Sequence, residues 1–299
     1  MATVTSVMVQ ELYTDIVADI KSFVDDATLL NNPQFMMAMF DIAGSSGNTV
    51  RVPVQNAFTD AGEIQPGNSI ISVGGEYAYQ PTSVDISMKK FGVGTDIYED
   101  ALEDGGIALV RSQLLNGLAG GLAQAIDKDG FATLTAAGTQ DGNVAVTGKA
   151  TIVMSPQSLA MASKRQPTVK TWFDPDTDSH QFRATSRTGF AAVPNGTSVG
   201  VRLVDCEDVI GTGSVTLADY AKSVANLRAG NHATMASGFY AGFINPAAEY
   251  ALASELNGLA GTTGTVGDLS DLGNQALVSA LVGQAIGIAF ARTNNLTAA

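Results

Sequence analysis

Residues 104–134 read DGGIALVRSQLLNGLAGGLAQAIDKDGFATL, and this stretch constrains the fold more than any other. After Asp104-Gly105-Gly106, apolar residues recur at steps of three and four along one face: Ile107, Val110, Leu114, Leu118, Leu122 and Ile126. That spacing predicts an amphipathic helix. A helix from about Gly106 to Leu134 would be ~40 Å long at 1.5 Å per residue.

Two β-like segments precede this helix. Valines alternate with polar residues and Pro53 over residues 48–54, which predicts a half-buried edge strand, and a second alternating run follows over residues 80–91. The stretch between them, Gln55 to Pro81, is rich in Gly, Asn, Gln and Pro but still contains several large apolar side chains. A connection of this length inside a compact domain is normally functional or disordered. We therefore expect an extended hairpin that reaches over another molecule.

The rest of the chain mixes helical and β patterns, which indicates an α+β fold. Residues 11–30 carry a helical apolar stripe before Pro33, which opposes continuation. Its members are Leu12, Ile16, Ile20, Phe23 and Val24. The patch from Phe35 to Phe40 fits either core burial or docking on a neighbour. Further strands are expected at residues 144–146, 151–154, 181–185, 198–204, 239–244 and 287–292, and further helices at residues 217–227 and 246–256.

Composition limits the function classes. The formal net charge is −13, from 16 Lys plus Arg against 29 Asp plus Glu, which argues against gripping phosphate backbones. Charged residues make up only 15% of the chain, as expected if much of its surface is buried against partners. Cys206 is the only cysteine, so no intrachain disulfide can form, and a small buried side chain is the simplest role for it.

Two observations bear on the compartment. The opening segment lacks a secretory pattern, since its first basic residue is Lys21, and we expect a reducing cytoplasm. Residues 272–291 carry no charge and contain a GxxxG pattern, which is compatible with a membrane span. Polar residues and glycines dilute that stretch, so a buried helix followed by a strand is the preferred interpretation.

Catalytic patterns are weak, and we expect no enzyme activity, no cofactor and no metal. The two histidines, His180 and His232, lack a metal-like spacing, and no nucleophile elbow, dinucleotide loop or Walker lysine occurs. Asp174, Asp176 and Asp178 alternate as Ca²⁺ ligands can, but Ser179 and Thr185 stand where an EF-hand loop requires glycine and glutamate. A solvated acidic turn is the simpler interpretation.

The order from Thr49 to Thr139 resembles the major capsid proteins of tailed phages, the Hong Kong ninety-seven type shell fold. The loop strands at 48–54 and 80–91, the bridging piece Gly92–Gly105 and the helix from Gly106 match the family's extended loop and spine helix. Residues 217–246 look like its axial helix and its strand, Asn-Pro, helix step. The resemblance implies an icosahedral shell subunit that forms hexamers and pentamers around double-stranded DNA. It also implies assembly in the bacterial cytoplasm with a separate scaffold protein and a portal.

The resemblance further implies a division of the chain. It gives an N-terminal arm at 1–47, an extended loop at 48–91, a bridging segment and spine helix at 92–137, a β-rich peripheral segment at 138–213 and an axial domain at 214–299. The loop would lie across an adjacent subunit and bury apolar side chains there: Phe58, Ile64, Ile70, Tyr77 and Tyr79. Because residues 55–79 contain no lysine, we expect no covalent link between subunits through this loop.

One departure from the family pattern concerns order. The segment from Thr151 to Val204 is similar to a closing β segment that usually ends the chain, but here it precedes the axial-type segment. Either the segments are matched wrongly or the C-terminal half is rearranged. Two alternatives to a phage capsid remain open, namely an encapsulin-like compartment shell and a virion-surface or decoration β protein.

Overall fold

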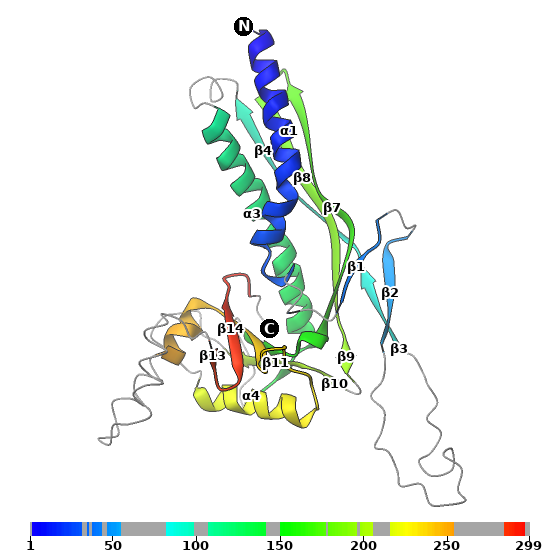
Figure 1. Ribbon diagram of the computed structural model, residues 1–299, viewed down its shortest axis with the longest axis vertical. Helices are drawn as coiled ribbons and strands as arrows, with labels where there is room; N and C mark the ends of the chain where they lie inside the picture. The colour runs from blue at the N-terminus through cyan, green and yellow to red at the C-terminus, as the bar shows by residue number, and fades with distance from the viewer. Residues whose placement is uncertain are drawn as a thin grey trace, which may run out of the picture.

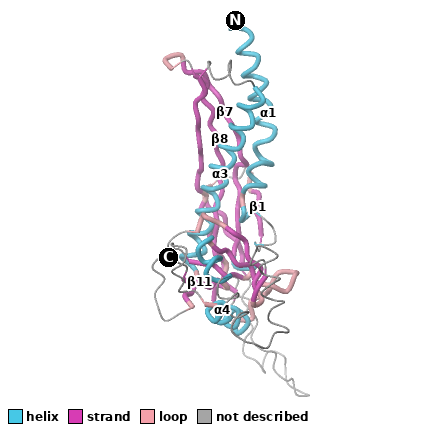
Figure 2. Tube along the Cα trace, turned by 90° about the vertical axis from the view of Figure 1, so that its left-hand side faces the viewer, coloured by secondary structure: helices cyan, strands magenta, loops and turns pink. Residues whose placement is uncertain are grey.

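The computed structural model describes residues 2–31, 35, 38–43, 47–54, 82–98, 107–141, 150–177, 179–195, 198–205, 216–253 and 284–296. Two long helices, α1 and α3, lie along a long four-stranded sheet, and a six-stranded sheet with α4 forms the base (Figure 1). Seen from the side, the helices occupy one flank of the long strands (Figure 2). The molecule is therefore an elongated body standing on a wider base.

Helix α3 (Ile107–Ala137) confirms the predicted long helix and continues three residues beyond Leu134. The expected face is the buried face, since five of its side chains are at most 8% exposed: Val110, Leu114, Leu118, Leu122 and Ile126. The side chain of Ile107 lies outside the described residues. Burial of this stripe against α1 and the sheet stabilises the helix despite its three central glycines.

Helix α1 (Ala2–Ala27) begins nine residues before the predicted start and is followed by the 3-10 turn η1 (Leu29–Asn31). Four side chains at i, i+4 spacing are buried: Leu12, Ile16, Ile20 and Val24. The predicted stripe was wrong at Phe23, which is 41% exposed. Position 23 lies about 100° around the helix from position 24, so both cannot point at the core.

The long sheet has the order β1-β7-β8-β4. Its strands are β1 (Ala38–Asp41), β4 (Lys89–Tyr98), β7 (Leu159–Asp174) and β8 (Ser179–Ala192). Strand β1 runs parallel to β7, and the other pairs are antiparallel. Most of β7 was not predicted, and β4 occupies part of the expected bridging piece. Phe182 and Ala184 alternate on the face covered by α1 and α3 and are fully buried.

The predicted hairpin before α3 is confirmed by β2 (Thr49–Val54) and β3 (Thr82–Ser87), which pair antiparallel with Val52 opposite Val84. The second strand ends at Ser87 and not at Phe91. Met88 N still donates to Asn48 O at 2.8 Å, and the chain then crosses into β4 of the long sheet.

The base sheet has the order β13-β14-β12-β6-β11-β5. Its strands are β5 (Thr139–Gln140), β6 (Ala150–Met154), β11 (Val201–Asp205), β12 (Tyr240–Ile244), β13 (Gln284–Ala285) and β14 (Ile288–Arg292). The turn η4 (Pro156–Ser158), the short pair β9 (Pro194–Asn195) and β10 (Ser198–Val199), α4 (Leu217–Ala229) and helical residues 246–253 complete the chain.

The base sheet is covered on both faces. Ile152 and Phe243 belong to the core cluster that includes α3, whereas Val153 and Tyr240 belong to the cluster around α4. The strands of residues 138–213 therefore divide between the two sheets, with β7 and β8 in the long sheet and β5, β6 and β11 in the base.

Several expectations fall outside the described residues. These are the strand at 144–146, the environment of Cys206 and the helix expected before β14. Within the described ranges, no helix combines the length and apolar character that a membrane crossing requires.

Candidate assembly surfaces

The five predicted contact residues of the loop, Phe58, Ile64, Ile70, Tyr77 and Tyr79, all lie outside the described residues. What the structure describes is the base from which the loop leaves. There β2 and β3 carry an exposed ion pair between Arg51 Nε and Asp85 Oδ1 at 3.0 Å. The hydrogen bond to Arg51 lowers the pKa of the Asp85 carboxyl.

The hairpin is packed firmly on the body. Val52, Val54 and Ile86 are buried against alanines of β7 and β8. At Gly189 of β8 the strands approach so closely that a Cβ atom would overlap the carbonyl of Ser87. The hairpin therefore covers the lower part of the sheet face that the helices leave free, and it fixes the positions of Val54 and Thr82.

Beyond the hairpin, the same sheet face carries positive charge. Along β8 the helix-facing residues are buried, while Arg183 and Arg187 point to the other side. Lys170 of β7 is paired directly opposite Arg183, and Arg165 is opposite Arg187, which in turn faces Lys90 of β4. We call these five outward-facing side chains the cationic face.

The far end of the long strands is aromatic. Tyr98 is 60% exposed, Trp172 38% and Phe173 44%. The guanidinium of Arg183 lies over the Trp172 ring at 4.3 Å from its centroid, and His180 lies against the Phe173 ring at 4.9 Å. Exposed aromatic side chains next to arginine are typical of residues that contribute most to protein interfaces.

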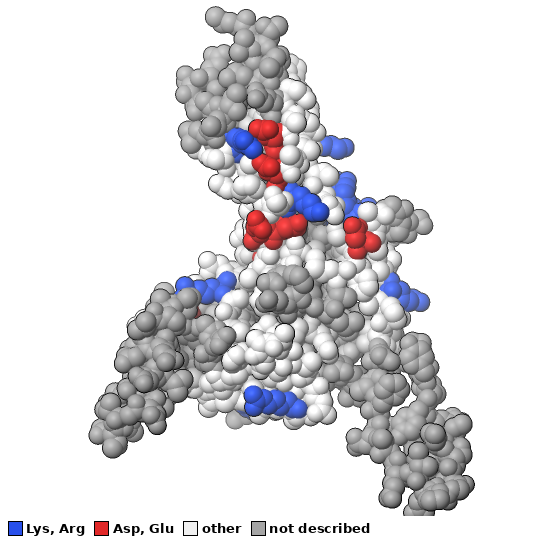
Figure 3. Space-filling view, viewed as in Figure 1, with Lys and Arg blue, Asp and Glu red and all other residues white. Residues whose placement is uncertain are grey.

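The helical flank has a different character. Arg111 of α3 pairs with Asp15 at 3.2 Å and with Asp19 at 2.7 Å, both on α1. In the view of Figure 3, acidic and basic groups adjoin one another over the two helices, and uncharged surface predominates over the described part of the base. Two acidic side chains of α1 are thus paired with α3 within the subunit.

Asp127 connects three distant segments. Its carboxylate on α3 accepts hydrogen bonds from the backbone N–H of Leu29 and of Leu30, both at 3.1 Å, and from the side chain of Asn295. The residue is 2% exposed. Burial raises the pKa of the Asp127 carboxyl, and these hydrogen bonds oppose that rise. The turn after α1 and the end of the chain are therefore fixed to the centre of the molecule by one side chain.

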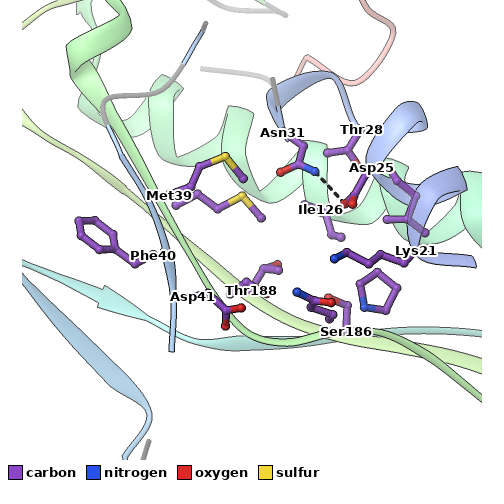
Figure 4. A pocket seen from close by; sticks show the side chains of 15 residues that line it. Lys21, Asp25, Thr28, Asn31, Met39, Phe40, Asp41, Ile126, Ser186 and Thr188 are labelled. Carbon is purple, nitrogen blue, oxygen red and sulfur yellow. Dashed lines mark hydrogen bonds between the residues drawn. The ribbon is translucent and has the colours of Figure 1, made fainter. Parts of the chain in front are cut away.

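A cavity of about 220 Å³ lies between α1, β1 and the β7–β8 pair (Figure 4). Its titratable lining residues are Lys21, Asp25 and Asp41. Asp25 accepts a hydrogen bond from Asn31 Nδ2 at 2.8 Å, and Asp41 accepts one from the backbone N–H of Ala43 at 3.0 Å. Burial raises the pKa of Asp25, while Lys21 lowers it to a smaller degree. Both carboxylates thus serve local structure.

The two histidines lie far apart in the fold, since His180 is next to the acidic turn at the start of β8 and His232 follows α4 in the base. His232 is buried beyond α4, and its carbonyl accepts a hydrogen bond from Tyr240 Oη at 3.0 Å. Burial, and then Arg202, lowers the pKa of His232. Among the residues with described placement, no group of three or more His, Cys, Asp or Glu side chains could hold a metal ion.

The Asp-rich stretch forms the turn between β7 and β8. Asp174 accepts hydrogen bonds from Asp176 N at 3.1 Å and from Gln181 Nε2 at 3.3 Å, which is the role expected of a turn carboxylate. Asp178 lies outside the described residues.

Comparisons with known proteins show similarity to solved structures. No protein-family model and no curated protein matches the sequence. Among solved structures, the chain is similar to the capsid of bacteriophage JBD30, with a TM-score of 0.51 and 11% identity over 91% of this chain and 92% of that chain. The procapsid of the same phage gives 0.46 and 11% over 79% and 87%, and a virus-like particle from Pyrococcus furiosus gives 0.43 and 8% over 64% and 99%. The JBD30 capsid similarity confirms the α+β shell fold that the sequence predicted.

Proposed function

Because the chain has the shell fold of a bacteriophage capsid protein, we propose that it is the major capsid subunit of a tailed phage. The observation that carries the proposal is the similarity to the JBD30 capsid, which extends over nearly the whole of both chains. In this role the protein is structural and not catalytic. Copies would assemble into hexamers and pentamers that close around double-stranded DNA.

The hairpin base supports an assembly role for the loop. Residues 55–81 leave and re-enter the subunit through β2 and β3, which are held against β7 and β8. A fixed exit direction lowers the entropy lost when the loop is ordered on a neighbour. Burial of two large side chains such as Phe58 and Ile64 would contribute ~3–6 kcal/mol before ordering costs.

In this proposal the parts of the chain keep the roles that the resemblance implies. Residues 1–47 form the N-terminal arm, 48–91 the extended loop, and 92–137 the bridging segment and spine helix. Residues 138–213 form the β-rich peripheral segment and 214–299 the axial domain, and the two segments meet where β6 pairs with β12. In a closed shell each subunit would make many weak contacts at once, and linked contacts together bind more tightly than any one of them alone.

The proposed partners are other copies of the chain, a separate scaffold protein and a portal. Assembly would take place in the bacterial cytoplasm. The chain's acidity suits a container, since a strongly acidic wall does not bind the packed DNA tightly. An encapsulin-like compartment is the alternative, and a neighbouring portal or terminase gene would distinguish the phage shell from it.

The test is electron microscopy with sedimentation of the recombinant chain, alone and with its candidate scaffold. We expect closed shells, tubes or rings with the scaffold. A chain that remains monomeric under both conditions would contradict the proposal. Phe58→Ala with Ile64→Ala should reduce shell yield, whereas Asn56→Ala with Ser72→Ala in the same loop should leave it unchanged.

A further inference from the structure

The cavity between α1, β1 and the β7–β8 pair (Figure 4) has a buried floor and an exposed mouth. The floor combines apolar and hydroxyl side chains, each at most 6% exposed: Val24, Thr28, Ile126, Met161, Ser186 and Thr188. The mouth is charged, since Lys21, Asp25 and Asp41 line it and are exposed. A concave site with apolar walls and a few polar groups is the usual form of a small-molecule site.

Two polar atoms of the lining residues have no partner. The hydroxyl of Thr188 is buried and bonds no described atom, and the same holds for the Asn31 Oδ1 carbonyl oxygen. The other two hydroxyls of the floor are satisfied, because Thr28 and Ser186 donate to backbone carbonyls at 2.7 and 3.2 Å. Buried polar atoms are nearly always hydrogen-bonded. The Thr188 and Asn31 oxygens are therefore positioned to bond a ligand in the cavity.

The carboxylates at the mouth also retain bonding capacity. Asp25 accepts from Asn31 through Oδ1, and Asp41 accepts from the backbone N–H of Ala43 through Oδ1, so Oδ2 of each bonds no described donor. Lys21 forms no ion pair with a described carboxylate. Burial raises the pKa of the Asp25 carboxyl, and Lys21 offsets this effect only in part, so the carboxylate charge is incompletely compensated.

These groups favour a cation over an anion. The titratable lining consists of one positive group, Lys21, and two negative groups, Asp25 and Asp41, which gives a formal charge of −1. A carbonyl oxygen such as Asn31 Oδ1 can only accept a hydrogen bond. An ammonium group has three donors and no acceptor, which matches the Asn31 carbonyl, the Thr188 hydroxyl and one carboxylate. An anion would instead face two carboxylates and a carbonyl oxygen.

The floor limits the remainder of the ligand. The cavity volume is about 220 Å³, below the ~300–1,000 Å³ of sites for drug-sized ligands. Val24, Ile126 and Met161 offer apolar surface that water does not satisfy. An unbranched stem of about four methylene groups can lie along such a surface while its charged head bonds polar groups, as a lysine side chain does.

We propose that this cavity binds a primary alkylammonium group with a stem of about four carbons, supplied by a free diamine or by a lysine side chain of another protein. Asp25, Asn31 and Thr188 would bond the ammonium group, and the positive charge of Lys21 would oppose it. The proposal goes beyond the shell function and does not depend on it.

Calorimetric titration of the dissociated full-length chain at low salt tests the ligand class. We expect saturable binding of n-butylamine and of 1,4-diaminobutane, and binding of n-butanol that is at least about tenfold weaker, since it has the same stem without the charge. A lysine derivative blocked at both backbone groups is the side-chain probe. Tighter binding of this probe than of 1,4-diaminobutane would assign the site to a partner's lysine, and the reverse order would assign it to a free diamine.

Substitutions give effects of opposite sign. Thr188→Val keeps the shape but removes the hydroxyl, and Asp25→Asn removes the charge, so each should weaken n-butylamine binding by about tenfold. Lys21→Met removes an opposing charge and should strengthen binding by about threefold. Because the chain has a net charge of −13, amines also associate with it non-specifically. Asp26→Asn and Lys222→Met measure that contribution, since both residues are exposed and neither lines the cavity.

Three results would overturn the proposal. The first is the lack of saturable binding by either amine and by the lysine probe. The second is n-butanol binding as tightly as n-butylamine, which would make the cavity a purely apolar site. The third is an n-butylamine affinity in Thr188→Val and Asp25→Asn equal to that in Asp26→Asn, which would place the bound amine elsewhere on the chain. Melting followed by circular dichroism verifies that each variant is folded.

Discussion

Replacement of Asp127 by alanine should destabilise the subunit more than any other single change of a charged residue on α3. The carboxylate accepts the backbone N–H groups of Leu29 and Leu30 at 3.1 Å each, and it is 2% exposed. Alanine leaves both donors without their acceptor in a place that water reaches poorly. An unpaired buried donor costs about 1–3 kcal/mol.

The expected loss is therefore about 2–4 kcal/mol, after allowing for relief of the desolvation of a buried carboxylate. Asp127→Asn keeps the shape and one acceptor but turns an amide N–H₂ towards a donor, so about half of that loss is expected. Asp129→Asn is the matched control. It removes the partner of the exposed Lys89, and such a pair contributes at most about 1 kcal/mol.

The assay is urea unfolding of the dissociated chain followed by circular dichroism. Burial raises the folded-state pKa of Asp127 above its ordinary value of 3.8, so the folded state binds the proton more tightly. The stability of wild type relative to Asp127→Asn should therefore be greatest below that value and decrease as the pH rises through the folded pKa. A loss for Asp127→Ala no larger than that for Asp129→Asn would refute the reasoning.

Three further predictions follow from particular contacts. Gly189→Ala should cost about 1–3 kcal/mol and reduce shell yield, because the new Cβ overlaps the Ser87 carbonyl and displaces the hairpin, and a normal melting temperature would contradict this. Burial and Arg202 depress the pKa of His232 below 6.5 in the folded state. The neutral imidazole therefore contributes to the free energy of unfolding above pH 6.5, and this contribution is lost as the pH falls through the folded pKa. Urea unfolding at pH 7.5 and 5 should show this loss in wild type and a smaller one in His232→Gln. Assembled shells should give a single band on a denaturing gel, since the loop lacks lysine and Lys89 at its base pairs with Asp129, and a ladder of linked subunits would be the contrary result.

Elements with an apolar period could be predicted from the sequence. The stripe along α3 and the alternation in β2 and β3 mark the face that meets the core, and the continuous apolar run of β12 marks a strand that is buried on both faces. The strand β14 was likewise found at its expected place. In these elements the side chains that define the pattern are also the ones that the fold buries.

Strand β7 could not be predicted in the same way. Its middle reads Ser163-Lys-Arg-Gln-Pro167, which is polar and contains a proline. The strand persists because it pairs on both sides, with β1 and with β8, and because register shifts between Ser163 and Thr168 accommodate the proline. Hydrogen-bonded pairing therefore stabilises this strand, although its middle lacks hydrophobic alternation.

The position of the cationic face also depends on how β7 pairs with β8. Whether Lys170 stands opposite Arg183 or beside it depends on the same register shifts, and a slip of one residue would turn the charges towards the helices. No count of charges along the sequence reveals these opposed positive charges. The glycines of β4, which lie in the expected bridging piece, leave room for the side chains of Arg183 and Thr185.

The unusual order of the C-terminal segments is compatible with a single packed body. Strand β6 lies at the centre of the base sheet, with β11 on one side and β12 on the other. The long β7–β8 hairpin leaves the base after β6, and the chain returns to it at β11. The base sheet therefore needs strands from both segments, whichever comes first along the chain. A chain ending before α4 would leave one edge of β6 unpaired and would remove Phe243 from its contacts with Phe35 and Phe131, so the two segments cannot be independent folding units.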